Sequence, residues 1–313
     1  MGAISNRDRA RGVGPRDMAE RKLSLIVATK GRTAELTRLL RSLELQDFRD
    51  FEVIIVDQNS DERLAPCVDS GLWSFPLRWI RAPADTGVSR GRNVGCREAA
   101  GEIVLFPDDD CWYPPQFLSY GMEVMQATGA DLVSGLSADY AGRAINARFS
   151  SRTRRMTRRS VWIAQMEWAS FIRREMFDAL GGYDETLGIG STTPWQAAEG
   201  PDLILRALEQ GRLCLFDHTL VGHHKEFDLK SDPLMARKGR AYARGMGYVL
   251  RRHGFGFPTI FYWTARPLVR LLLAGVRGRL SQAGYFLAVA IGRAEGWGAA
   301  AKDPGPTLMA SRS

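Results

Sequence analysis

The most constraining feature of this chain is the alternation of two residue patterns along its first 140 residues. Short aliphatic and β-branched runs occupy 23–29, 51–56, 77–80, 102–106 and 131–136, and we expect each to form a strand. Apolar residues at helical spacing predict helices from about Thr33, whose hydroxyl is placed to cap, at 93–100, and from about Pro114 or Pro115 to Gly129. Because parallel strands need such crossovers, the sequence predicts an α/β fold with a mostly parallel sheet flanked by helices.

Polar residues follow three of these expected strands at the point where each ends. The segments are 29–32, 57–60 and 108–110, after the first, second and fourth strands. Ligands of open α/β sheets bind beyond the carboxyl ends of the strands. The sequence therefore predicts one crevice at this edge of the sheet, lined by residues from all three segments.

Three consecutive aspartates, Asp108, Asp109 and Asp110, form the most acidic of these segments. Neighbouring carboxylates repel one another unless a cation compensates them. In an extended segment Asp108 and Asp110 point to the same side and Asp109 to the other. Oxygen ligands at an open position suit Mg²⁺ or Mn²⁺. An acidic turn that caps the next helix is the alternative interpretation.

Asp57 follows the apolar run 51–56 and lies where a dinucleotide-binding fold places its ribose-binding acid. A carboxylate there accepts hydrogen bonds from a nucleobase or from ribose hydroxyls. The alternative is a local turn in which Asp57, Asn59 and Ser60 bond to nearby backbone groups.

Six motifs in order resemble those of glycosyltransferase family 2. They are LSLIVATKGR at 23–32, DFRDFEVIIVDQNS at 47–60, GRNVG at 91–95, FPDDD at 106–110, FIRREMFDALGGYDE at 171–185 and EGPDLILRALEQG at 199–211. The resemblance covers about residues 22–225. It implies the GT-A fold, with a nucleotide-sugar-binding half at 22–140 and an acceptor half at 141–229, and metal-dependent, inverting transfer of a sugar to a saccharide or lipid-linked acceptor.

The resemblance also implies roles for individual residues. Donor-binding residues would be Thr29, Arg32, Asp57, Arg92, Asn93, Asp108 and Asp109, with Asp110 as the direct metal ligand beside Asp108. A helix-start role explains Arg92 and Asn93 nearly as well. Some relatives add a histidine ligand, for which His223 and His224 are the candidates, and Trp168 and Trp195 are candidates to stack on acceptor sugars. Structural packing is the alternative for all four.

The expected base position departs from the family pattern. The base is usually the second acid of a pair near the start of a helix, and here the pair is Glu199-Gly200. Either Glu199 or Asp202 then serves as the base, or the protein is a non-catalytic scaffold. We favour Glu199, in the loop before an expected helix at 201–209, because Asp202 also suits the role of a first-turn acid that compensates the helix dipole.

The net charge and the cysteines are evidence on the cellular location of the protein. The formal charge is +8, but residues from Lys230 onward carry +11 and the rest −3. Residues 1–21 resemble a flexible basic tail without a secretory signal, and four scattered cysteines without a CxxC pair favour a reduced, cytoplasmic setting. The apolar stretch 255–276 is interrupted by Arg266, Pro267 and Arg270, which argues against a membrane-spanning helix.

The basic region 230–313 is expected to form amphipathic helices. Cations beside aromatic and aliphatic residues suit peripheral attachment to the inner face of the cell membrane. A nucleic-acid-binding protein is the rival interpretation, based on this region and on seven arginines within 143–159. We do not expect nucleic acid as the partner, because the acidic crevice would repel phosphates in the absence of a metal.

Overall fold

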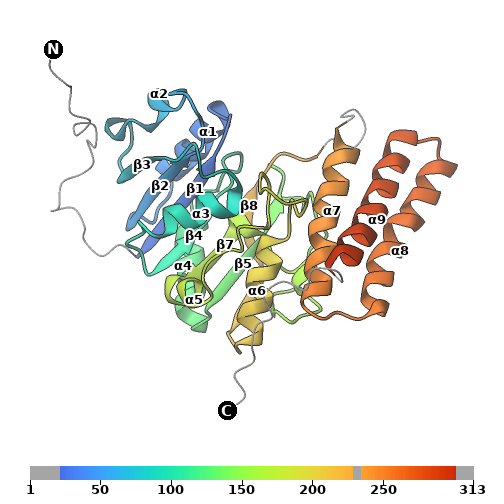
Figure 1. Ribbon diagram of the computed structural model, residues 1–313. Coiled ribbons are helices and arrows are strands. Elements are labelled where there is room, and N and C mark those ends of the chain that lie inside the picture. Colours follow the sequence, from blue (N-terminus) through green and yellow to red (C-terminus); the bar gives the residue numbers. More distant parts are fainter. Residues whose placement is uncertain (1–21, 228–233, 301–313) are drawn as a thin grey trace.

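The computed structural model describes residues 22–227 and 234–300, and its central element is an eight-stranded sheet (Figure 1). The strand order is β3-β2-β1-β4-β7-β5-β8-β6. The strands are β1 (Leu23–Thr29), β2 (Phe51–Asp57), β3 (Leu77–Arg81), β4 (Ile103–Leu105), β5 (Leu132–Ala138), β6 (Arg154–Arg155), β7 (Ser170–Arg173) and β8 (Cys214–His223). The expected tail at 1–21 lies outside the described residues.

Strands β1 to β4 form the parallel part of the sheet. β1 pairs in parallel with β2 and β4, and β2 pairs in parallel with β3. Almost every residue of β1 and β2 is buried, because helices cover both faces of the sheet. One face packs on α1 (Ala34–Glu44) and α4 (Phe117–Thr128), and the other packs on α3 (Val88–Cys96). The expected α/β fold is confirmed.

β7 makes the sheet mixed, because it runs antiparallel to β4 and β5 and lies between them. It follows the short helix η3 (Glu167–Ala169) and leads into α5 (Arg174–Ala179). β8 then pairs in parallel with β5, after the helix α6 (Glu199–Glu209). Residues from both expected halves of the domain therefore build a single sheet.

Three long helices follow the sheet: α7 (Met235–Arg252), α8 (Phe257–Val276) and α9 (Leu280–Ala300). Figure 1 shows α7 between the sheet domain and the other two. A Cβ on Gly247 or Gly292 would collide with the backbone of the facing helix, so these glycines let α7 and α9 approach closely. None of the described helices is long and apolar enough to cross a membrane.

The remaining described helices are short. They are α2 (Ala65–Val68), η1 (Ser70–Leu72) and η2 (Val161–Ile163). All four cysteines are buried and unpaired with one another, as their spacing predicts.

Several predicted helix boundaries are wrong. The helix expected at 93–100 runs Val88–Cys96, because it begins directly after Gly87, whose φ of 102° ends the preceding loop. The helix expected near Pro114 begins at Phe117, after a turn in which the Phe117 amide donates to the Pro114 carbonyl. The Thr33 side chain does not cap α1; its carbonyl instead accepts the Thr37 hydroxyl.

Candidate active site

A cavity of about 500 Å³ lies at the carboxyl ends of the parallel strands. Its lining residues come from many segments between Ala28 and Tyr242. Its lining includes Arg32, Gln58, Arg92, Asp108, Asp109, Asp110, Glu167, Trp168, Glu199, His224 and, from α7, Tyr242. The helical region thus supplies one wall of the cavity.

The three aspartates after β4 all line the cavity, and a turn at 109–110 replaces the extended backbone expected there. Asp109 accepts the Thr29 hydroxyl at 2.7 Å and an Arg32 guanidinium nitrogen at 2.5 Å. That same nitrogen lies 2.7 Å from Asp110 Oδ2. Thr29 is fully buried, so it positions Asp109 and does not itself line the cavity.

Asp108 and Asp110 face a histidine on the other side. Their oxygens and a His224 ring nitrogen all lie within 4.8 Å of one another, and His224 Nε2 is 3.0 Å from Asp110 Oδ1. Burial opposes ionisation of both groups, yet their mutual hydrogen bond and charges lower the pKa of Asp110 and raise that of His224. Two carboxylates and an imidazole fit a divalent cation, and the nitrogen ligand suits Mn²⁺ better than Mg²⁺.

Arg92 links this acidic group to the other end of the cavity. It projects from α3 with an almost fully buried side chain. Its guanidinium lies 2.7 Å from Asp108 Oδ1 and 3.4 Å from Glu199 Oε1. A buried cation here offsets part of the charge of both carboxylates.

Glu199 is the first residue of α6, so the loop placement expected for it is wrong, because the helix begins two residues earlier than expected. The residue before it, Ala198, has a φ of 76°, an uncommon conformation for a side chain with a Cβ. Asn146 is the other described non-glycine residue with positive φ, and it also lines the cavity. Strained backbone of this kind clusters at functional sites.

Glu167 is a cavity residue that sequence reasoning missed. It begins η3, which two serines hold in place: the Met166 amide donates to the Ser134 hydroxyl at 2.8 Å, and the Ser170 hydroxyl donates to that oxygen at 2.7 Å. Burial and the charge of Glu199 raise the pKa of Glu167 to about 7. Burial likewise raises the pKa of Glu199, against the opposing effect of Arg92.

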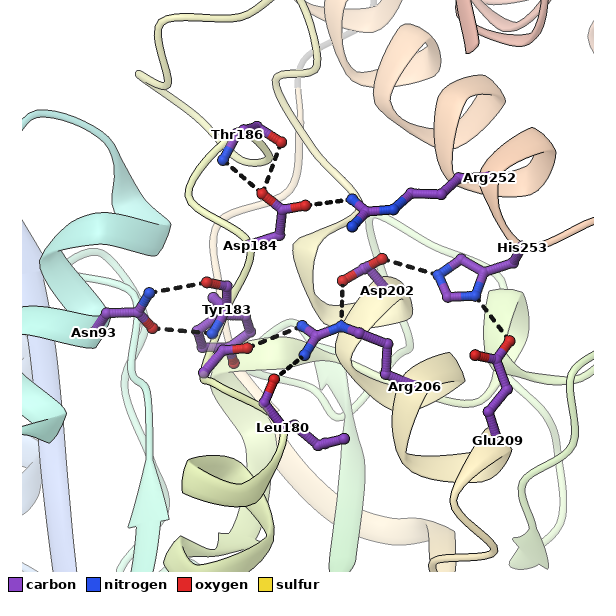
Figure 2. A network of polar contacts seen from close by, with 11 residues as sticks. Asn93, Leu180, Tyr183, Asp184, Thr186, Asp202, Arg206, Glu209, Arg252 and His253 are labelled. Atoms are coloured by element: carbon purple, nitrogen blue, oxygen red, sulfur yellow. Dashed lines mark hydrogen bonds and ion pairs between the residues drawn. The ribbon is translucent and has the colours of Figure 1, made fainter. Parts of the chain in front are cut away.

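Asp202, the second candidate base, lies outside the cavity. Figure 2 shows its carboxylate between Arg206 Nε, at 2.8 Å, and His253 Nε2, at 2.9 Å. The other ring nitrogen of His253 is 3.0 Å from Glu209. With no exposed surface and both oxygens engaged, Asp202 ties α6 to the end of α7.

Three further candidates also have structural partners away from the cavity. Asn93 exchanges hydrogen bonds with the backbone of Tyr183, as Figure 2 shows. His223 bonds to the Asp139 carbonyl and stacks on Trp112, so it points away from the aspartates that His224 faces. Trp195 stacks on Tyr248 of α7 at 4.5 Å between ring centroids.

The remaining two candidates lie at or behind the cavity wall. Asp57 is fully buried and accepts hydrogen bonds from the Asn59 amide at 2.8 Å and from Trp79 Nε1 at 3.1 Å. Its neighbour Gln58 reaches the cavity instead. Trp168 lines the cavity and stacks on His224, with ring centroids 5.9 Å apart.

Comparison with known proteins supports a family assignment for the sheet domain. The family model of glycosyl transferase family 2 matches residues 24–181, just over half of the chain. An uncharacterized glycosyltransferase of Haemophilus influenzae is 40% identical over 104 residues, which is 33% of this chain and 34% of that protein. The matched region spans about a third of the length of the first curated relatives.

Two further proteins resemble the chain. The GalNAc(5)-diNAcBac-PP-undecaprenol beta-1,3-glucosyltransferase of Campylobacter jejuni is 35% identical over 92 residues, 28% of this chain and 29% of that protein. The structure of mannosyltransferase PcManGT from Pyrobaculum calidifontis in complex with GDP-Man and Mn²⁺ aligns with a TM-score of 0.60 and 17% identity. The alignment covers 89% of this chain and 88% of that one, and it shows a shared fold.

Proposed function

Since the chain belongs to glycosyl transferase family 2, we propose that it is a metal-dependent, inverting glycosyltransferase that moves a sugar from a nucleoside-diphosphate sugar to a saccharide or lipid-linked acceptor. The observation that carries the proposal is the ligand cluster of Asp108, Asp110 and His224 in the same cavity as the acid at the start of α6. A cation-binding end and a proton-accepting end are the two functions that such a transfer requires.

Asp108, Asp110 and His224 would hold the Mn²⁺ or Mg²⁺ ion. When bound, the ion stabilises the negative charge that develops on the departing diphosphate. Arg32 contributes a second positive charge at this end: its guanidinium bridges Asp109 and Asp110 and is 45% exposed. It can therefore reach phosphate oxygens without leaving the carboxylates that orient it.

The nucleoside would lie beside the ends of β1 and β2. Thr29 acts there by orienting Asp109, and Asp57 acts from behind the wall by fixing the turn that presents Gln58 and Asn59. The Asn59 side chain in turn accepts the Gly31 amide at 2.7 Å, which ties the two strand ends together. These contacts keep the donor pocket preorganised.

Asp202 is not placed to act as the base, because it does not line the cavity. Glu199 lines the cavity and is 8% exposed, while Asp202 is fully buried in its contacts with Arg206 and His253. A base must reach the proton that it accepts, and this condition favours Glu199 over Asp202. In an inverting transfer the acceptor oxygen attacks the anomeric carbon from the side opposite the diphosphate. The base removes the acceptor proton on that same side.

Nucleotide release tests the proposal. Wild type with Mn²⁺ is incubated with GDP-mannose, UDP-glucose, UDP-galactose and UDP-N-acetylglucosamine, with water as the acceptor, and the released GDP or UDP is measured. We expect release from at least one donor, abolished by EDTA and restored by Mn²⁺. No release from any donor would support the scaffold alternative, and tight, salt-sensitive RNA or DNA binding in its place would support the nucleic-acid alternative.

We also propose that α8 and α9 attach the protein to an anionic bilayer at the cytoplasmic face of the membrane, near lipid-linked acceptors. Large apolar side chains on these helices are exposed: Phe257, Phe261, Leu272, Leu273, Val276, Leu280 and Leu287. Arg270, Arg277 and Arg279 lie among them, and an apolar surface with interspersed cations suits an anionic lipid surface. The acceptor class in the name of the Campylobacter relative is consistent with this location.

Co-sedimentation with vesicles tests the attachment. We expect wild type to bind vesicles that contain phosphatidylglycerol and to bind pure phosphatidylcholine vesicles at least fivefold less. The double variant L272S/V276S should lose binding, while the control L72S, which removes an exposed leucine from the sheet domain, should not. Equal binding by L272S/V276S and wild type would contradict the proposal.

A further inference from the structure

We infer that Glu167 is a catalytic residue of this site: it supplies from η3 the second carboxylate that Gly200 lacks, and it accepts the proton of the acceptor hydroxyl. The inference rests on the proposed function and deepens it. It assigns the base to a position that is remote from α6 in the sequence and adjacent to it in space.

The geometry at Gly200 is the first support. A Cβ built on Gly200 would lie 2.6 Å from Glu167 Oε1 and 2.7 Å from its Cδ, and its three nearest atoms all belong to Glu167. The carboxylate of Glu167 therefore fills the space that an acidic side chain at position 200 would enter. Gly200 and Glu167 are complementary, since a side chain at either position excludes the other.

Exposure to the cavity is the second support. Glu167 is partly exposed and lines the cavity, whereas Glu199 is 8% exposed and has Arg92 within 3.4 Å. Arg92 favours the ionised form of Glu199, but no cation lies within salt-bridge distance of Glu167 among the described residues. Both acids line the cavity, and of the two Glu167 is the more exposed and, within the described part of the chain, the one without a cation in salt-bridge contact, so it has the stronger reason to take up a proton.

The charged groups around Glu167 define how it would titrate. They are Glu199 of α6, Arg92 of α3 and Asp108 after β4. Two carboxylates held together in a buried site bind one proton between them more readily than either does alone. The pair is thus suited to accept a proton near neutral pH, which is where a general base works best.

The transfer step balances as follows. The acceptor oxygen forms a bond to the anomeric carbon while the bond from that carbon to the diphosphate oxygen breaks. The electron pair of the broken bond leaves on the nucleoside diphosphate. The hydroxyl proton passes to the Glu167 carboxylate, with the electron pair of the O–H bond retained by the acceptor oxygen.

Three variants test the inference with the donor that wild type turns over. E167Q keeps the shape of the side chain but cannot accept the proton, so its turnover should fall about 100- to 10,000-fold. The double variant E167A/G200D moves the carboxylate to position 200, and its turnover should exceed that of E167A at least tenfold. E123Q, at an exposed glutamate of α4, is the matched control and should retain full turnover.

Binding separates a catalytic role from a structural one. The dissociation constant of the Mn²⁺–UDP or Mn²⁺–GDP complex, measured by calorimetry, should change less than threefold in E167Q. Turnover of E167Q within threefold of wild type would overturn the inference, and so would E167A/G200D that is no faster than E167A. A wild type that releases no nucleotide would instead overturn the proposed function, before any variant is compared.

Discussion

Two acidic groups line one cavity, and they differ in the cations that surround them. Asp110 at the donor end contacts Arg32 at 2.7 Å and His224 at 3.0 Å. Glu167 and Glu199 lie near Arg92, which is 3.4 Å from Glu199 and binds Asp108 more closely, at 2.7 Å. The same kind of side chain therefore experiences opposite electrostatic environments within one cavity.

This difference in nearby cations suits the two groups of carboxylates to different tasks, cation binding and proton transfer. Burial raises the pKa of every carboxylate in the cavity, and nearby cations decide whether the effect is reversed. It is reversed at Asp110, whose pKa is lowered. It is not reversed at Glu167, whose pKa rises to about 7. Asp108 and Asp109 keep raised pKa values beside Arg92 and Arg32, so among these aspartates the reversal is confined to Asp110, whereas Glu167 is suited to proton transfer.

The largest effect is expected at the anionic end. D110N removes a charged ligand from the cluster with Asp108 and His224, so turnover should fall at least about 1,000-fold. Nucleotide release with saturating Mn²⁺ measures it. D178N, at an exposed aspartate of α5, is the control and should retain turnover. If D110N remains within tenfold of wild type, the assignment of the metal site to this end is wrong.

A smaller effect is expected at an acid that belongs to neither end. D202N weakens the contacts of α6 with Arg206 and His253, so the free energy of unfolding should fall by about 2 kcal/mol. Turnover at 20 °C should stay within threefold of wild type, because Asp202 does not line the cavity. Urea unfolding and nucleotide release together check this. Loss of turnover with unchanged stability would make Asp202 the base after all.

The smallest effect is a pH-dependent change in stability at the acceptor end. The folded protein holds a proton on Glu167 up to about pH 7, whereas the unfolded chain releases it near 4.5. Stability therefore falls as the pH rises through this window, and E167Q avoids that loss because it does not ionise. The melting temperature of E167Q should match wild type at pH 4.5 and exceed it at pH 8. A lower value at pH 8 would indicate that ionised Glu167 stabilises the fold.

Much of the fold could be predicted from the sequence, because short stretches of residues specify its strands and helices. β1 and β2 are continuous apolar runs that end in polar residues, and such runs specify buried parallel strands wherever they occur. The antiparallel insertion of β7 between β4 and β5 could not be predicted, since Ser170–Arg173 carries no signal for its partners. Helix starts were displaced where a turn, and not a side-chain cap, fixes the first residue.

The residues of the candidate site were likewise only partly predictable from the sequence. The grouping of Asp108 and Asp110 around one cation site was predictable, but the extended backbone expected there is wrong, because the chain turns at 109–110 and the Cys111 amide donates to the Asp108 carbonyl. The choice of His224 over His223 was not predictable, because it depends on how the end of β8 packs on Trp112. Glu167 could not be predicted from the sequence, because its proximity to Gly200 depends on how η3 packs beside α6.

The most direct test of this separation of tasks is the melting temperature of three proteins with UDP or GDP, in the presence and absence of Mn²⁺. A ligand that binds only the folded state raises the melting temperature. For wild type we predict a rise with nucleotide that requires Mn²⁺, the same rise for E167Q, and none for D110N. A rise that needs no Mn²⁺, or one that D110N retains and E167Q loses, would contradict the account.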